Sequence, residues 1–272
     1  MKRILNILIM ILIFATSVHA EKAEEESIAI VKKMLNEKVV WAVSDVYPPY
    51  TFHSKEENKG FVVDVLKEIF EPLGYIVNYQ TISWEKSLKM IDKGHADCLL
   101  GGYAKHAVNM GIPVPKYPIG VMRMHFFGKK GSYADTEWEY DGTEESLMKV
   151  KIGVQAGAVY GDEFDTYFKK APRFSVQPNF GNQATRNNIL KVLAGRIDVI
   201  IEDHNVLSFL VHQMDLKNKL ISVGHEQNMG TPYYIFFSRK SPYYAQYTEI
   251  LEKGLKQMIQ SGQIDKIKTR YF

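Results

Sequence analysis

The 272-residue sequence contains a single cysteine, Cys98. One cysteine excludes an intramolecular disulfide, and its apolar neighbours in residues 96–100 predict that it lies in a core strand. The sequence also has no large excess of charge of either sign. It contains 34 basic and 31 acidic residues, and its formal net charge is only +3. This balance removes the electrostatic case for binding nucleic acid or an anionic membrane surface.

Patterns of metal and covalent chemistry are missing as well. The eight histidines include no HExxH pattern and no cluster with cysteine at ligand spacing, so no metal site is expected. No G-x-S-x-G pattern occurs, and the glycines in residues 128–132 lack the spacing of a phosphate-binding loop. We therefore expect no cofactor and no enzymatic activity.

One long apolar run is present, and it lies at the N-terminus. Residues 4–14 are almost wholly apolar, follow Lys2 and Arg3, and lead to small residues that end at Ala20. This pattern predicts a signal peptide over residues 1–20 and export to the periplasm. A membrane anchor is the weaker alternative, because the run is shorter than the ~20 residues that cross a bilayer.

The rest of the chain alternates between strand and helix patterns, which predicts an α/β protein. An acidic amphipathic helix is expected within residues 21–37. A first cycle then runs from residue 39 to residue 100, with strands expected at 39–43 and 75–80 and a helix at 84–93. A second cycle runs from residue 151 to residue 203, with a strand expected at 151–155 and a helix at 162–169. The two cycles and the chain length predict two similar lobes.

Two extended segments are expected to connect the lobes, at residues 121–127 and 233–238. They make the first lobe discontinuous, with lobe 1 over residues 38–124 and 232–272 and lobe 2 over residues 125–231. A long amphipathic helix is expected over residues 242–261. A ligand would then lie in the cleft between the lobes.

Six short motifs occur in order along the chain. They are Tyr47-Pro48-Pro49-Tyr50, Gly60-Phe61 with Asp64, the KGHAD of residues 93–97, the VQAG of 154–157, the GRID of 195–198, and the SGQIDK of 261–266 before Tyr271-Phe272. In this order they resemble family 3 periplasmic solute-binding proteins, the amino-acid-binding components of ABC importers. The resemblance implies a type II periplasmic-binding-protein fold, a small-molecule solute as ligand, an ABC permease as partner and a monomer.

The resemblance also implies residues that hold an amino acid. The family's carboxylate-binding arginine falls on Asn109, and its threonine in the second lobe falls on Val159. The small hydroxyl residues that assist the arginine fall on Gly101, Gly102 and Ala104. The acidic residue that accepts the ligand's ammonium group is kept as Asp203. The usual contacts to the α-carboxylate are therefore altered, while the contact to the amine is retained.

Several alternatives follow from this pattern. Lys105, His106 or Arg186 can supply a replacement cation, or the ligand can be an amine or other polar solute without an α-carboxylate. Aromatic residues on loops near the cleft can surround a cation, although packing in the core explains each of them equally well. These aromatics are Tyr47, Tyr50, Phe52, Trp84, Tyr103 and Tyr160. Asp203, at a strand end, can instead cap the helix that follows.

The predicted ligand-binding set combines these positions. It comprises Tyr47, Tyr50, Trp84, Gly102, Tyr103, Asn109, Gln155, Gly157, Val159, Arg186 and Asp203. The leading hypothesis is a periplasmic protein that delivers a solute to an ABC importer. A sensory protein that presents its closed form to a membrane receptor or kinase is the alternative. A dehydratase, with Glu202 or Asp203 as general acid or base, is a remote third possibility.

Overall fold

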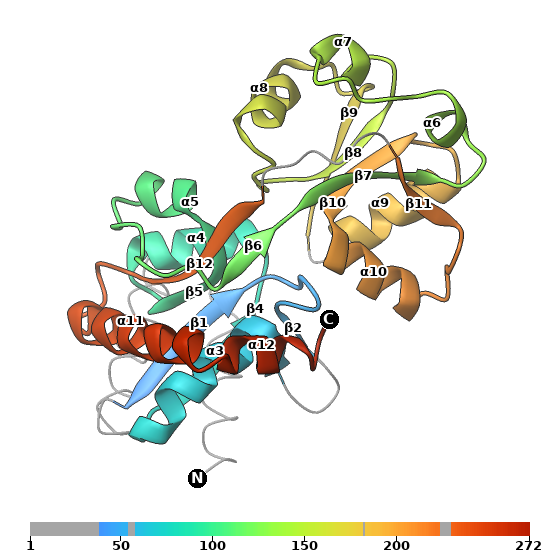
Figure 1. The fold of residues 1–272 in the computed structure, drawn as a ribbon. Coiled ribbons are helices and arrows are strands. Elements are labelled where there is room, and N and C mark those ends of the chain that lie inside the picture. The colour runs from blue at the N-terminus through green and yellow to red at the C-terminus, as the bar shows by residue number, and fades with distance from the viewer. Residues whose placement is uncertain (1–37, 54–57, 182, 224–229) are drawn as a thin grey trace, which may run out of the picture.

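The structure, a computed structural model, describes residues 38–53, 58–181, 183–223 and 230–272. Two five-stranded sheets form the centres of two lobes, which lie one above the other in Figure 1. Both the first described strand and the C-terminus lie in the same lobe. The predicted signal peptide and the predicted helix at residues 21–37 lie outside the described residues.

Lobe 1 contains the mixed sheet β4-β1-β5-β12-β6. Strand β1 is parallel to β4 and β5, whereas β12 is antiparallel to β5 and β6. The strands are β1 (Val39–Ser44), β4 (Ile76–Thr81), β5 (Cys98–Tyr103), β6 (Gly120–Met122) and β12 (Thr231–Phe237), with the small hairpin β2 (Phe52–His53) and β3 (Asn58–Lys59). The helices are α3 (Phe61–Phe70), the 3-10 helix η1 (Glu71–Leu73), α4 (Trp84–Lys93), α5 (Ala104–Asn109), α11 (Tyr244–Gln260) and α12 (Gln263–Lys268).

Lobe 2 contains the sheet β11-β7-β10-β8-β9. Strand β8 is parallel to β9 and β10, and β7 is antiparallel to β10 and β11. The strands are β7 (Met124–Lys129), β8 (Ile152–Gln155), β9 (Val176–Asn179), β10 (Val199–Asp203) and β11 (Leu220–Val223). The helices are α6 (Tyr133–Thr136), α7 (Glu144–Leu147), α8 (Asp162–Lys170), α9 (Ala184–Leu193) and α10 (His204–Gln213).

The connection from β6 to β7 passes directly between the lobes through Arg123, within the predicted segment 121–127. The return differs from the prediction for residues 233–238. Strand β12 begins at Thr231 and pairs with β5 and β6 of lobe 1, so residues 233–237 lie within the sheet of lobe 1 and do not cross between the lobes. Its apolar residues Ile235, Phe236 and Phe237 are buried as in a central strand. The two-lobe fold with a discontinuous first lobe is confirmed.

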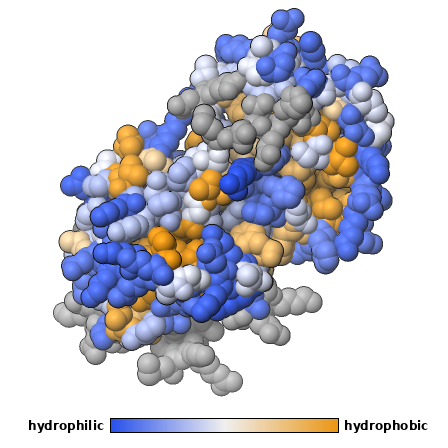
Figure 2. Space-filling model, in the orientation of Figure 1, coloured by the Kyte–Doolittle hydropathy of each residue, from blue (hydrophilic) through white to orange (hydrophobic). Residues whose placement is uncertain are grey.

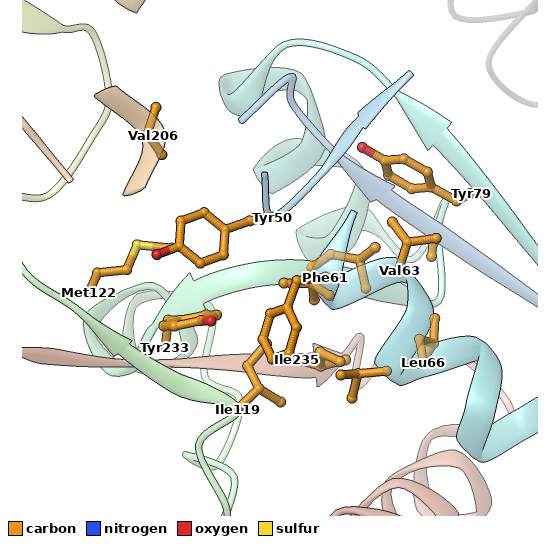
Figure 3. Packing of buried hydrophobic residues seen from close by; sticks show 14 of the residues in the cluster. Tyr50, Phe61, Val63, Leu66, Tyr79, Ile119, Met122, Val206, Tyr233 and Ile235 are labelled. Atoms are coloured by element: carbon orange, nitrogen blue, oxygen red, sulfur yellow. The ribbon is translucent and has the colours of Figure 1, made fainter. Parts of the chain in front are cut away.

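Helix α3 packs into the core of lobe 1, because seven of its ten residues are apolar and all seven are buried. Figure 3 shows Phe61, Val63 and Leu66 of this helix in one cluster with Tyr79 of β4 and Ile235 of β12. The helix begins after Gly60, whose φ of 135° suits glycine. A Cβ atom at this position would also collide with the Tyr50 carbonyl group, so glycine lets the two backbones approach.

Several sequence-based expectations are confirmed at the level of single elements. Helix α4 has the predicted bounds, and β4, β8 and α8 agree with the prediction to within about one residue at each end. Cys98 is a free and fully buried thiol in β5, as its apolar neighbours predict. None of the helices in the described part of the chain has both the length and the apolarity needed to cross a bilayer. Figure 2 shows a mostly hydrophilic face with smaller hydrophobic areas.

Helix α11 provides a direct test of this packing. Its buried residues Tyr247, Leu251, Leu255 and Met258 follow the helical period, whereas Ile259 is 46% exposed. We expect Leu255→Ala to lower the free energy of unfolding by about 2–5 kcal/mol, because it leaves a cavity in the core. Ile259→Ala, on the same helix, should stay within about 0.5 kcal/mol of the parent protein. Urea unfolding followed by circular dichroism measures both, and equal losses would contradict the assigned packing.

Candidate functional site

A cavity of about 50 Å³ lies between the two lobes. It is found at the carboxyl ends of the parallel strands β1, β5, β8 and β10, the usual position for ligands in open α/β sheets. Both lobes contribute to its wall. The lining residues are Ser44, Asp45, Tyr47, Tyr50, Thr51, Trp84, Leu100, Gly101, Tyr103, His106, Met122, Met124, Gln155, Ala158, Val159, Tyr160 and Glu202.

The segment between Tyr47 and Tyr50 brings two phenols to this cavity. The carbonyl oxygen of Tyr47 accepts hydrogen bonds from the backbone N–H groups of Tyr50 and Thr51, which closes a tight turn. The turn stacks the two tyrosine rings with centroids 5.8 Å apart. Tyr47 then donates its hydroxyl hydrogen to Glu202 Oε1 at 2.6 Å, and Tyr50 donates to Asp203 Oδ1 at 2.9 Å. The Asn205 side-chain amide also donates to the Tyr50 hydroxyl at 3.0 Å, so three hydrogen bonds join this turn to lobe 2.

Glu202 is a buried carboxyl group with several donors around it. Besides Tyr47, the Thr185 hydroxyl donates to Oε2 at 2.6 Å and the Asp203 backbone N–H donates to Oε1 at 2.9 Å. Burial raises the pKa of Glu202 to about 7, and these hydrogen bonds only partly oppose the shift. Near neutral pH the group is therefore divided between its charged and uncharged forms.

Asp45 is the second buried carboxyl group of the cavity and belongs to lobe 1. It follows β1 directly, and the side-chain amide of Gln155, from lobe 2, donates to its Oδ2 at 2.8 Å. Burial raises the pKa of Asp45 to about 6, and the negative charge of Glu85 contributes to the same direction. A further hydrogen bond thus crosses between the lobes.

His106 adds no charge to the cavity at neutral pH. Its Nδ1 atom accepts a hydrogen bond from the Tyr103 backbone N–H at 3.0 Å, so the remaining proton of the neutral ring is on Nε2. Burial lowers the pKa of His106 to about 4, although the nearby Asp165 opposes this shift. The ring lies edge-on to Trp84, with centroids 5.2 Å apart.

The structure brings six of the predicted residues to the cavity: Tyr47, Tyr50, Trp84, Tyr103, Gln155 and Val159. Gly102 is buried in β5 but is not part of the wall. A Cβ atom there would collide with the Phe236 ring, so close packing explains this glycine. Gly157 is also absent from the wall, although it lies near Trp84 and Glu85.

Asn109, expected near a ligand carboxylate, is exposed and is the last residue of α5. The reason is that this helix begins at Ala104, directly after β5. At 1.5 Å per residue, Asn109 is about 9 Å further along the helix axis than Tyr103. The residues that line the cavity here are Tyr103 and His106.

Asp203 has a different position from the one expected. Its Oδ1 accepts hydrogen bonds from Tyr50 and from the backbone N–H groups of Asn205 and Val206, and its Oδ2 accepts one from the Arg123 backbone N–H. It is therefore the N-cap of α10, the alternative that its strand-end position allowed. It does not line the cavity, whereas its neighbour Glu202 does. A contact between Asp203 and a ligand stays a prediction.

The two candidate replacement cations also lie away from the cavity. Lys105 forms an ion pair of 3.2 Å with Asp165 of lobe 2. Arg186 lines a neighbouring cavity of about 260 Å³, which shares Tyr47 and Gln155 with the first one. Of the three candidates, only the uncharged His106 reaches the first cavity.

Sequence reasoning did not identify three notable wall residues, namely Asp45, Met122 and Met124. Asp45 carried a usable signal, because it follows a predicted strand at the edge where ligands bind. The two methionines flank the connection between the lobes and had no comparable signal. Across the residues that the structure describes, no group of three or more His, Cys, Asp or Glu side chains is placed to hold a metal ion.

Comparisons with known proteins agree with this geometry. Residues 39–108 match the family model of bacterial extracellular solute-binding proteins, family 3. The arginine-binding extracellular protein ArtP of Bacillus subtilis (strain 168) is 20% identical over 239 residues, covering 86% of this chain and 86% of ArtP. These findings confirm the resemblance that the six motifs predict.

Two solved structures share the fold. An ancestral arginine-binding protein bound to arginine matches with a TM-score of 0.70 and 22% identity, over 86% of this chain and 98% of that chain. A histidine kinase sensor domain with similarity to periplasmic binding proteins matches with a TM-score of 0.67 and 18% identity, over 86% of this chain and 95% of that chain. The type II periplasmic-binding-protein fold is thereby confirmed.

The raised pKa of Glu202 predicts how stability depends on pH. A carboxyl group whose pKa is higher in the folded state binds its proton more tightly there, so stability falls as pH rises from about 4.5 to about 7. Compared with Glu202→Gln, the ligand-free protein should lose roughly 3 kcal/mol of unfolding free energy across this range. Urea titrations at several pH values test this expectation, and parallel profiles for the two proteins would contradict it.

The contacts of Asp203 predict a structural role. Asp203→Ala removes the cap of α10 and the acceptor for Tyr50 and Arg123, so we expect a loss of about 2–4 kcal/mol in unfolding free energy. Asp92→Ala, at an exposed position of α4, is the control and should change stability by less than about 0.5 kcal/mol. Urea unfolding measures both, and an unchanged Asp203→Ala variant would refute the capping role.

Proposed function

We propose that this chain is a family 3 bacterial extracellular solute-binding protein, which captures a small polar solute between its lobes for delivery to an ABC importer. The solute is an amine or an amino-acid-like molecule, bound without the family's usual arginine. The observation that carries this proposal is the cavity itself, because it lies at the strand ends of both sheets and side chains of both lobes line it.

The cross-lobe hydrogen bonds support a binding cycle of opening and closure. Tyr47 with Glu202, Gln155 with Asp45, and the ion pair of Lys105 with Asp165 all join one lobe to the other. They can form only in the closed arrangement, and opening replaces them with water. A solute that contacts both walls therefore favours closure, and the closed surface is what a membrane partner recognises.

The proposed bounds of the lobes lie within one residue of the sheet boundaries, since Met124 belongs to β7 of lobe 2 and Thr231 belongs to β12 of lobe 1. Lobe 1 comprises residues 38–124 and 232–272, and lobe 2 comprises residues 125–231. We place the protein in the periplasm as a monomer after removal of residues 1–20, on the basis of the signal-peptide pattern and of relatives described as extracellular. An ABC permease is the proposed partner.

A sensory role is the second candidate, and it is favoured by the likeness to a histidine kinase sensor domain. The binding step would be the same, but the closed form would engage a membrane receptor. An enzymatic role is not part of the proposal. Both oxygens of Glu202 accept hydrogen bonds within the protein, and Asp203 is a helix cap outside the cavity.

Binding in this cavity is tested with Val159→Phe, which places a ring in the space between the lobes. The parent protein should show a rise of about 5–10 °C in melting temperature with its solute at about 100 times Kd. The readouts are thermal shift and intrinsic tryptophan fluorescence, to which Trp84 of the cavity wall contributes, across amino acids, amines, small carboxylates and short peptides. Val159→Phe should lose the shift, whereas Val108→Phe, at a position 64% exposed, should keep it.

Two results would contradict the proposal. One is the absence of any shift across the whole set of solutes, and the other is unchanged binding by Val159→Phe.

A second experiment distinguishes transport from sensing by comparing cells that carry the gene with cells that lack it. Loss of uptake of the bound solute supports the importer role, whereas normal uptake with an altered transcriptional response supports the sensory role.

A further inference from the structure

The chemistry of the cavity wall narrows the class of solute, and this inference rests on the proposed function. We infer that the ligand is a small organic ammonium ion that carries no carboxylate. Asp45 of lobe 1 and Glu202 of lobe 2 would hold its positive charge from opposite sides, and aromatic rings would surround its apolar part.

The first support is the distribution of charge. Two carboxyl groups line the cavity, and none of the described lining residues is lysine or arginine. The only basic side chain in the wall is His106, which is uncharged near neutral pH. Glu85, close enough to affect Asp45, adds to the negative potential. An anionic group on the ligand would therefore meet repulsion without a compensating cation.

The second support is the engagement of hydrogen-bond donors. Tyr47 and Tyr50 donate to Glu202 and Asp203, and the Gln155 amide donates to Asp45. The Ser44 hydroxyl donates to the Leu100 carbonyl oxygen at 2.9 Å. Because these donors are already committed within the protein, a ligand carboxylate could gain them only by leaving a buried acceptor unpaired. The Nε2–H group of His106 has no partner among the described residues, but it offers a carboxylate a single uncharged donor in place of a cation. An ammonium ion needs acceptors instead, and carboxylate oxygens are its preferred partners.

The third support is the apolar part of the wall. Tyr47, Trp84, Tyr103 and Tyr160 present aromatic rings, and Met122 and Met124 present polarisable sulfur atoms. Aromatic faces attract organic cations, most strongly in sites that exclude water. The cavity of about 50 Å³ has space for only about four water molecules, at roughly 10–15 Å³ each. A small ligand with an apolar part fits such a wall.

A matched set of probes separates charge from size. Isothermal titration calorimetry of the purified protein would use n-propylammonium and trimethylammonium as cations. It would use 1-propanol as the neutral analogue of the same size, propionate as the anion, and glycine and L-alanine as zwitterions. We expect at least one of the two cations to bind at least about 10-fold more tightly than the other four probes, since one charge-assisted contact accounts for that ratio.

Isosteric variants assign the contacts. Asp45→Asn and Glu202→Gln keep the shape of each side chain and remove its negative charge, so each should weaken cation binding by about 10- to 100-fold. Asp92→Asn, on the exposed face of α4, is the matched control and should leave the affinity within about twofold of the parent protein. Circular dichroism confirms that each variant is folded, and the comparison of probes on the parent protein decides the case if one is not.

The outcomes distinguish this inference from the proposed function. Tighter binding of glycine, L-alanine or propionate than of either cation overturns the ammonium assignment and leaves solute capture in place. Equal affinity of Asp45→Asn, Glu202→Gln and the parent protein for the cation also overturns the assignment. Absence of binding by every probe and by the broader set of solutes overturns both proposals. Cation-selective binding that both isosteric variants weaken supports both.

Discussion

The burial of three carboxyl groups where the lobes meet is the constraint on which the remainder of the site depends. Asp45, Glu202 and Asp203 are each at most 6% exposed, and a buried carboxyl group needs hydrogen bonds or a proton to be tolerated. The protein supplies hydrogen bonds from the opposite lobe, through Tyr47, Tyr50 and Gln155. The partners of the acids are thus also the contacts that hold the lobes together. Occupancy of the cavity, protonation of its wall and closure of the lobes are consequently linked properties.

The same arrangement explains how the type II periplasmic-binding-protein fold can have a cavity whose wall residues differ from the ones that the family resemblance implies. Open α/β sheets commonly bind ligands at the carboxyl ends of parallel strands, and the cavity of this chain lies at that edge of both sheets. What differs is the chemistry of the residues that end those strands. Here the strand ends supply carboxyl groups and aromatic rings, while Lys105 is paired with Asp165 and Arg186 faces a neighbouring cavity. Selectivity can therefore change without rearrangement of the sheets, since only side chains at the strand ends need to differ.

Much of the architecture was predictable, because apolar periodicity sets the long elements. Helix α4 has the predicted bounds, while the short α5 was not predicted because its period covers less than two turns. The site was less predictable for two physical reasons. Neighbouring residues of a strand point to opposite sides, so Glu202 faces the cavity and Asp203 faces α10, a difference that spacing alone does not resolve. The place of Asn109 depends on where α5 begins, and sequence signals locate helix ends only to within a few residues.

The discontinuous lobe also affects the order in which the chain can fold. Lobe 2 is built from neighbouring stretches of sequence, so its strands can pair as soon as they are synthesised. Strand β5, in contrast, pairs with β12, which follows only after the whole of lobe 2. The sheet of lobe 1 can therefore be completed only after β12, which is distant from β5 in sequence, has been synthesised. Such long-range pairing slows folding. A chain with this topology presents a nearly complete second lobe while the first still lacks a central strand, and the unpaired edge of β5 is the part of the chain that most needs protection by a chaperone.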